Sequence, residues 1–208
     1  RNEDNKAVSF EWINKIADAS GKEVKLISKS MVLNAGQEVK LTLDKNEISQ
    51  PHLWSPTDPY LYKVKSQLVA NGKILDEVTN AIGFRWFRFE PGNGFYLNGS
   101  KLQLRGTNRH QDMKDKGDAL TLADHRRDLQ LIKEMGSNFL RLAHYPQAAE
   151  VLKLAYELGL LIWEETPVVN FITNSPEFLT NTQNMIREMI TQGYNHPSVI
   201  MWGSTNEI

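Results

Sequence analysis

The hydrophobic period of the chain changes near residue 105, and this change limits the fold more than any other feature. Before it, apolar side chains alternate with polar ones, as Val8, Phe10 and Trp12 do. After it, short apolar runs alternate with segments in which apolar side chains recur every three or four positions. The first pattern indicates half-buried strands, and the second indicates strands that alternate with amphipathic helices. The sequence therefore predicts two architectures in one chain.

Residues 1–90 contain several short alternating runs separated by turn residues. Further apolar positions with this alternation are Val24, Leu26, Val39, Leu41, Leu43, Tyr60, Tyr62, Val64 and Leu68. The pair Asn71-Gly72 suits a tight hairpin, because both residues tolerate a positive φ. Short strands with this spacing predict an immunoglobulin-like β-sandwich domain over residues 1–90.

Residues 91–208 alternate strands with helices after an initial hairpin at Asn98-Gly99. Helices are predicted after Thr121, which forms a capping box with Asp124, over residues 147–158, and from Ser175-Pro176 to Gly193. Apolar strands precede, separate and follow these helices. Strand and helix alternation of this kind implies parallel strands with right-handed crossovers. We therefore predict the first half of a (β/α)8 TIM barrel over residues 91–208, as a truncated catalytic domain.

Polar side chains gather at the C-terminal ends of the four predicted barrel strands. They are Asn108, Arg109, His110, His144, Glu164, Glu165, Asn206 and Glu207. The opposite strand ends, which follow the helices, carry mostly glycine and small polar residues. Barrel enzymes keep their chemistry at the C-terminal ends of their strands. This asymmetry favours an active site that includes Glu207 over an isolated solvated carboxylate.

Several segments together resemble glycoside hydrolase family 2, the family of β-galactosidases and β-glucuronidases. They are Leu53-Trp54-Ser55-Pro56, Gly83-Phe84-Arg85, Leu97-Asn98-Gly99, Arg105-Gly106-Thr107-Asn108-Arg109-His110, Arg141-Leu142-Ala143-His144-Tyr145-Pro146, and Asn195-His196-Pro197-Ser198-Val199-Ile200-Met201-Trp202, followed by Asn206-Glu207. These segments occur in the family's order and cover nearly the whole chain. The chain is similar to the central part of such an enzyme.

The resemblance implies a retaining β-glycosidase in which Glu207 is the general acid/base and Asn206 binds the sugar 2-hydroxyl. It also implies substrate contacts for His110, His144 and Asn108; a buried structural histidine is the alternative for His110 and His144. Arg105, Arg141, Glu164 and Trp202 are expected to support the site residues without contacting the substrate. Arg105, Arg109 and Arg141 are expected to pair with carboxylates inside the barrel. Glu164 is interpreted as a structural carboxylate at its strand end.

The resemblance places the catalytic nucleophile on a later strand, beyond residue 208. The 208 residues alone are therefore expected to be inactive, with open strand edges that favour association into homo-oligomers. The loop at residues 165–170 lacks the glutamate and histidine that hold magnesium in some family members, so no metal site is predicted. No organic cofactor is implied.

The remaining features narrow the class of partner. A formal net charge of −1 gives no field that would attract nucleic acid or an anionic membrane, and no apolar run is long enough to span a bilayer. The absence of cysteine leaves the compartment open, periplasmic, secreted or cytoplasmic. The expected partner is a carbohydrate. A terminal β-galactoside of an oligo- or polysaccharide is the predicted substrate, and the alternatives are a β-glucuronide, a β-mannoside or a non-catalytic carbohydrate-binding fragment.

Overall fold

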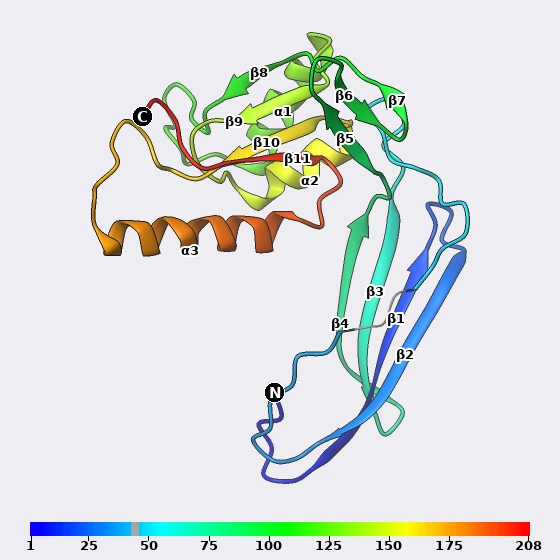
Figure 1. Cartoon of the computed structure of the whole chain (residues 1–208). Helices are drawn as coiled ribbons and strands as arrows, with labels where there is room; N and C mark the ends of the chain where they lie inside the picture. The colour runs from blue at the N-terminus through cyan, green and yellow to red at the C-terminus, as the bar shows by residue number, and fades with distance from the viewer. Residues whose placement is uncertain (43–45) are drawn as a thin grey trace. The chain divides into compact units, whose positions relative to one another are not determined.

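The computed structural model describes residues 1–42 and 46–208 and divides into two compact units. The first unit comprises residues 1–52 and 60–82, and the second comprises residues 53–59 and 83–208. Figure 1 shows the elements of each unit along the chain.

The first unit is built on a four-stranded antiparallel sheet with the order β2-β1-β3-β4 (Figure 1). Its strands are β1 (Val8–Ala17), β2 (Glu23–Leu33), β3 (Tyr62–Ala70) and β4 (Lys73–Ile82). The β3–β4 hairpin turns at Asn71 and Gly72, whose φ angles are +51° and +71°. Positive φ at both positions is the geometry that favours this residue pair, so the predicted hairpin is confirmed.

The segment around Val39 and Leu41 forms no strand over residues 39–42, and Leu43 lies outside the described residues. The two side chains instead line a hollow together with Phe10 and Trp12 of β1. The prediction of a strand over residues 39–42 is therefore wrong. Alternation shows that one face of a segment is apolar but does not supply a partner strand for its backbone, and here the apolar face lies beside the sheet.

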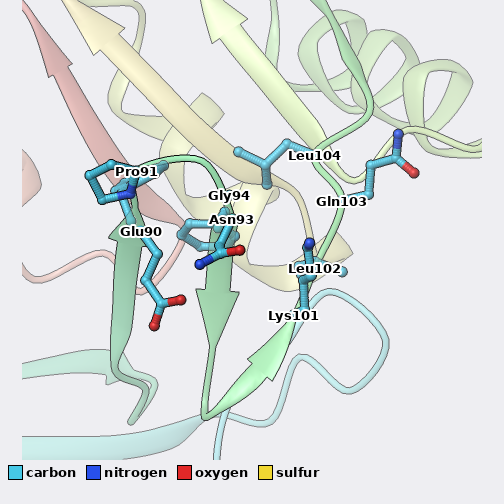
Figure 2. A pocket seen from close by; sticks show the side chains of 10 residues that line it. Glu90, Pro91, Asn93, Gly94, Lys101, Leu102, Gln103 and Leu104 are labelled. Atoms are coloured by element: carbon cyan, nitrogen blue, oxygen red, sulfur yellow. The ribbon is translucent and has the colours of Figure 1, made fainter.

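The second unit begins with a small antiparallel sheet of the order β5-β6-β7. Its strands are β5 (Phe87–Glu90), β6 (Gly94–Leu97) and β7 (Ser100–Lys101). The predicted turn at Asn98-Gly99 is confirmed, with φ angles of +52° and +87°. Figure 2 shows a hollow beside this sheet, with Glu90, Lys101 and Leu104 among its lining side chains. Leu104 lies two residues before Gly106, where the first barrel strand begins, so this hollow lies at the N-terminal end of that strand.

Two segments of the predicted first domain pack with the second unit. Trp54 is fully buried, and its Nε1 donates to the carbonyl of Tyr156 over 2.9 Å. Arg85 donates from Nε to the carbonyl of Pro197 over 3.0 Å and from Nη2 to that of Val199 over 2.7 Å. The packing units therefore differ from the predicted division into residues 1–90 and 91–208 at residues 53–59 and 83–90.

The main part of the second unit is a four-stranded parallel sheet with the order β11-β10-β9-β8, and its strands lie side by side in Figure 1. The strands are β8 (Gly106–Arg109), β9 (Phe139–Leu142), β10 (Leu161–Glu165) and β11 (Val199–Gly203). The helices between them are α1 (Leu122–Glu134), α2 (Ala149–Leu158) and α3 (Pro176–Gly193). Consecutive parallel strands joined by helices are the unit from which TIM barrels are built.

The helix ends follow the predicted capping residues. Thr121 and Asp124 form the capping box of α1, and the Ser175 side chain accepts a hydrogen bond from the backbone of Phe178 at the start of α3. Gly159 ends α2 with a φ of +70°. Helix α2 begins at residue 149 rather than 147, because the backbone of its N-cap Ala148 is not helical, with a ψ of 141°.

The core of the second unit lies between the parallel sheet and its helices. Leu140 and Leu142 of β9 and Ile162 of β10 are fully buried there, together with Leu129 of α1 and Val151 of α2. Side chains of a strand alternate between its two faces, so burying Leu140 and Leu142 directs the intervening Arg141 to the opposite face. The packing of the helices thus decides which polar side chains reach the other face of the sheet.

Candidate active site

The strand register assigns the polar side chains to two faces of the parallel sheet. Asn108, Arg141, Trp163 and Met201 occupy paired positions on neighbouring strands and share one face, called here the inner face. Glu165 lies two residues beyond Trp163 and belongs to the same face. The opposite face, which packs against α1, α2 and α3, is called the helix face.

Glu165 is the centre of the inner face. Its side chain is fully buried, and both carboxylate oxygens are occupied. Arg141 donates from Nε to Oε2 over 3.1 Å, and its Nη2 lies 3.0 Å from Oε1. Nδ1 of His144 lies 2.6 Å from the same Oε1. A two-pronged contact between guanidinium and carboxylate fixes the orientation as well as the position of both groups.

Arg141 also connects Glu165 to the end of β11. Its Nη2 donates to Oδ1 of Asn206 over 2.7 Å, and its guanidinium lies 4.8 Å from the ring centroid of Trp163. The backbone of Asn206 is held as well, because its N–H donates to the carbonyl of Val168 over 2.8 Å. The side chain and backbone of Asn206 are thus fixed independently.

Two histidines border this cluster. The rings of His110 and His144 lie 5.0 Å apart between centroids and meet edge to face at 77°. Within the described residues His110 is exposed, and Asn108, two residues earlier on β8, is exposed as well. The predicted substrate-side residues Asn206, His144 and His110 therefore gather at one end of the sheet.

Glu207 follows Asn206 directly and is exposed. Its backbone adopts a φ of +52°. Within the described parts of the chain, its carboxylate makes no hydrogen bond or ion pair, so it is available to a ligand at this end of the sheet. The structure therefore brings the predicted acid next to the Arg141, His144 and Glu165 cluster.

The predicted pairing of three arginines with carboxylates inside the barrel holds only for Arg141. Arg105 is exposed, precedes β8 and donates to the side-chain oxygen of Gln103 over 3.0 Å. Arg109 is buried on the helix face, with Nη2 2.9 Å from the Asp128 carboxylate of α1. One residue along a strand reverses the face, so Arg109 points away from the inner face that Asn108 shares.

Glu164 and Trp202 also lie on the helix face, so they do not support the inner-face cluster directly. A Cβ atom on Gly193 of α3 would lie 2.7 Å from the Trp202 ring and 3.0 Å from Oε2 of Glu164. Burial raises the pKa of Glu164 to about 7. Its Oε2 has no hydrogen-bond partner within the described residues.

Glu165, rather than Glu164, is the carboxylate that holds the candidate site. Sequence reasoning identified both but assigned the supporting role to Glu164. The alternation within β10 contained the missing signal, because a residue two positions from Trp163 shares its face and a residue one position away does not. Which of the two faces is the inner one depends on where the helices pack.

The described residues contain no group of three or more His, Cys, Asp or Glu side chains placed to hold a metal ion. Among the same residues, no helix is long and apolar enough to cross a membrane.

Comparison with known proteins identifies the family. The family model described as "Glycosyl hydrolases family 2, TIM barrel domain" matches residues 91–208, and the model "Glycosyl hydrolases family 2" matches residues 1–85. Together with the antiparallel and parallel sheets, these matches confirm the predicted fold class, an immunoglobulin-like β-sandwich followed by the first half of a TIM barrel.

Individual relatives agree with the family models. The chain is 40% identical over 169 residues to a beta-glucuronidase of Bacteroides fragilis, covering 77% of this chain and 24% of that protein. It is 40% identical over 190 residues to a beta-galactosidase of Thermoanaerobacterium thermosulfurigenes, covering 91% of this chain and 26% of that protein.

A solved structure of a Bacteroides uniformis beta-glucuronidase matches with a TM-score of 0.94 and 39% identity, over 99% of this chain and 25% of that one. The chain thus spans about a quarter of the length of these relatives. On these matches, the chain belongs to glycosyl hydrolase family 2.

Proposed function

We propose that the full-length protein is a retaining β-glycosidase and that this chain supplies its general acid/base, Glu207. The observation that carries the proposal is the Asn206-Glu207 pair at the end of β11, with Asn206 fixed by Arg141 over 2.7 Å. An exposed carboxylate beside a fixed amide suits protonation of a glycosidic oxygen next to a bound sugar hydroxyl.

The proposed reaction has two steps. A nucleophilic carboxylate attacks the anomeric carbon while Glu207 transfers its proton to the departing oxygen, which releases the aglycone as an alcohol. Glu207 then removes a proton from water, and the hydroxide oxygen replaces the carboxylate at the anomeric carbon. The sugar is freed with retained configuration, and Glu207 is protonated again.

The nucleophile is proposed to lie in a part of the full-length protein outside these residues. Retaining glycosidases need two carboxyl groups about 5 to 5.5 Å apart. Glu165 has both oxygens occupied by Arg141 and His144, and Glu164 faces the helices. Neither carboxylate is free to attack a sugar. The 208 residues alone are accordingly proposed to be inactive.

Two of the candidate sugars have support in the names of the relatives. The predicted terminal β-galactoside agrees with the name of the Thermoanaerobacterium thermosulfurigenes relative, and a β-glucuronide agrees with the names of the Bacteroides relatives. A glucuronide carries an extra carboxylate that requires a cationic partner. Arg141 is already paired with Glu165, so recognition of a glucuronide would need a further cation beyond the inner-face cluster.

The test compares wild-type and Glu207→Gln full-length protein on aryl β-galactosides, β-glucuronides and β-mannosides. Loss of the acid/base is expected to lower kcat/KM by about 10²- to 10⁴-fold on the sugar that wild type hydrolyses. Azide should restore turnover of an activated aryl glycoside by the variant, because azide attacks the glycosyl enzyme without a general base. Glu157→Gln, a change of an exposed α2 carboxylate paired with Arg126, is the control.

Unchanged hydrolysis by Glu207→Gln would refute the role of Glu207. Binding of sugars without turnover by the wild-type protein would instead favour the carbohydrate-binding alternative.

A further inference from the structure

We infer that Glu165 is a positioning residue that decides which hydrogen-bonding atom Asn206 and His144 offer to the substrate. The inference rests on the proposed function, because it requires a sugar at the ends of β9 to β11. Glu165 itself is fully buried and cannot contact a sugar. It acts through Arg141, whose guanidinium joins it to Asn206, and through a direct contact with His144.

The first step concerns the side-chain amide of Asn206. A guanidinium only donates hydrogen bonds, so the Asn206 atom that lies 2.7 Å from Nη2 of Arg141 must be the oxygen. The amide nitrogen then occupies the other branch of the side chain. Asn206 therefore offers an N–H donor to a ligand, and the ligand group opposite it must accept. Without the Glu165 contacts, the Arg141 guanidinium loses the partner that fixes its plane.

The second step concerns the ring of His144. Nδ1 lies 2.6 Å from the Glu165 oxygen that also faces Arg141, and a carboxylate accepts hydrogen bonds there. Nη2 of Arg141 also lies 3.2 Å from Nδ1, but it has closer acceptors in Oδ1 of Asn206 at 2.7 Å and Oε1 of Glu165 at 3.0 Å. The 2.6 Å contact between Nδ1 and the carboxylate requires a proton on Nδ1, so the neutral ring leaves Nε2 as an acceptor. A ligand group opposite Nε2 must donate.

The two steps together define the class of sugar that fits. A sugar hydroxyl can accept from Asn206, and a sugar hydroxyl can also donate to His144. A deoxy position does neither, and an ammonium group cannot accept from the Asn206 amide. Asn206 is the proposed partner of the sugar 2-hydroxyl. Glu165 thereby makes the site select glycosides with a free 2-hydroxyl and reject 2-amino-2-deoxy glycosides.

The test measures kcat/KM of the full-length protein for an aryl glycoside and for its 2-deoxy analogue. Glu165→Gln replaces one acceptor oxygen by an N–H₂ group, so Arg141 and His144 cannot both keep their contacts. In the variant, the ratio of kcat/KM for the aryl glycoside to kcat/KM for its 2-deoxy analogue is expected to fall about 10- to 100-fold, as loss of a transition-state hydrogen bond predicts. Glu164→Gln, the adjacent residue on the helix face, should keep the wild-type ratio.

A double-variant cycle separates positioning from a general structural role. Asn206→Ala and Glu165→Gln should each reduce the ratio, and combining them should reduce it little further, because both remove the same interaction. Equal losses on both substrates, or fully multiplicative effects in the double variant, would overturn the inference. If Glu165→Gln does not fold, Arg141→Lys serves instead, since a compact ammonium cannot join Glu165 to Asn206.

Crystal structures of wild-type and variant full-length protein test the inference without activity. Glu165→Gln is expected to separate the Arg141 guanidinium from Asn206 and to turn the Asn206 amide. An unchanged Arg141–Asn206 contact would contradict the positioning role. Failure of wild type to hydrolyse any glycoside would reject the proposed function, whereas the crystal structures would still decide the geometry.

Discussion

Glu164 and Glu165 are neighbours in the sequence, but they occupy opposite faces of β10 and different electrostatic environments. Glu165 is fully buried with both oxygens paired to Arg141 and His144. Glu164 is almost as buried, but its Oε2 has no partner among the described residues, and burial raises its pKa to about 7. Burial alone therefore does not decide the state of a carboxylate. The partners available on each face of the sheet decide it.

The largest effect is expected when the paired carboxylate is removed. Glu165→Ala leaves the largely buried Arg141 guanidinium on the inner face without its carboxylate partner, and it should destabilise the full-length protein by about 3 to 5 kcal/mol. Urea unfolding of wild type and variant measures the difference. A loss below about 1 kcal/mol would mean that Arg141 finds another partner or water, and that the pair contributes little.

The unpaired carboxylate should make stability depend on pH in the opposite way from a salt-bridged one. The folded-state pKa of Glu164 is about 7, above the ordinary value of 4.5. The folded state thus favours the neutral acid. The stabilisation that Glu164 contributes to the folded state is fully present below pH 4.5 and is lost as the pH rises through 7. The loss is about 3 kcal/mol between these limits.

Glu164→Gln should remove this dependence. Urea unfolding at pH 5 and pH 8 should show that the free energy of unfolding of the variant, relative to that of wild type, is higher at pH 8 than at pH 5. Glu157→Gln, at an exposed site on α2, is the matched control and should follow wild type at both pH values. A wild-type protein whose stability did not change relative to Glu164→Gln between the two pH values would show that water or a partner solvates Glu164.

A smaller effect tests the packing that encloses Glu164. Gly193→Ala places a methyl group 2.7 Å from the Trp202 ring and 3.0 Å from Glu164 Oε2. The crowding should cost about 1 to 3 kcal/mol, partly offset by the better helix propensity of alanine. The thermal unfolding midpoint measures the net change. A higher midpoint than wild type would show that α3 moves away from β10 and β11 without cost.

The smallest effect is expected at the start of α1, which covers the helix face away from both glutamates. Thr121→Ala removes the side-chain half of the capping box with Asp124 and should cost about 1 kcal/mol. The rate of hydrolysis by the full-length protein and its preference for substrates with a 2-hydroxyl should not change. Thr121→Ser, which keeps the hydroxyl, is the control and should stay close to wild type. A changed preference for the 2-hydroxyl would mean that the two faces are coupled.

Much of the second unit could be predicted because its signals are local. The capping box at Thr121, the glycine at residue 159 and the Asn98-Gly99 turn each act over a few neighbouring residues. The segment at residues 39–42 shows the limit of such reasoning. Its alternation is also local, but a strand needs a partner, and no nearby residue supplies that information.

The sequence by itself determined the alternation of strands and helices, the membership of glycosyl hydrolase family 2, and the position of Asn206-Glu207 at a strand end. Only the tertiary structure decided that Glu165 faces Arg141, while Glu164 lies beneath α3 and Arg109 binds Asp128 of α1. The reason is the two-residue period of a strand. A shift of one position exchanges the faces, and contacts between distant segments choose which face is covered by helices.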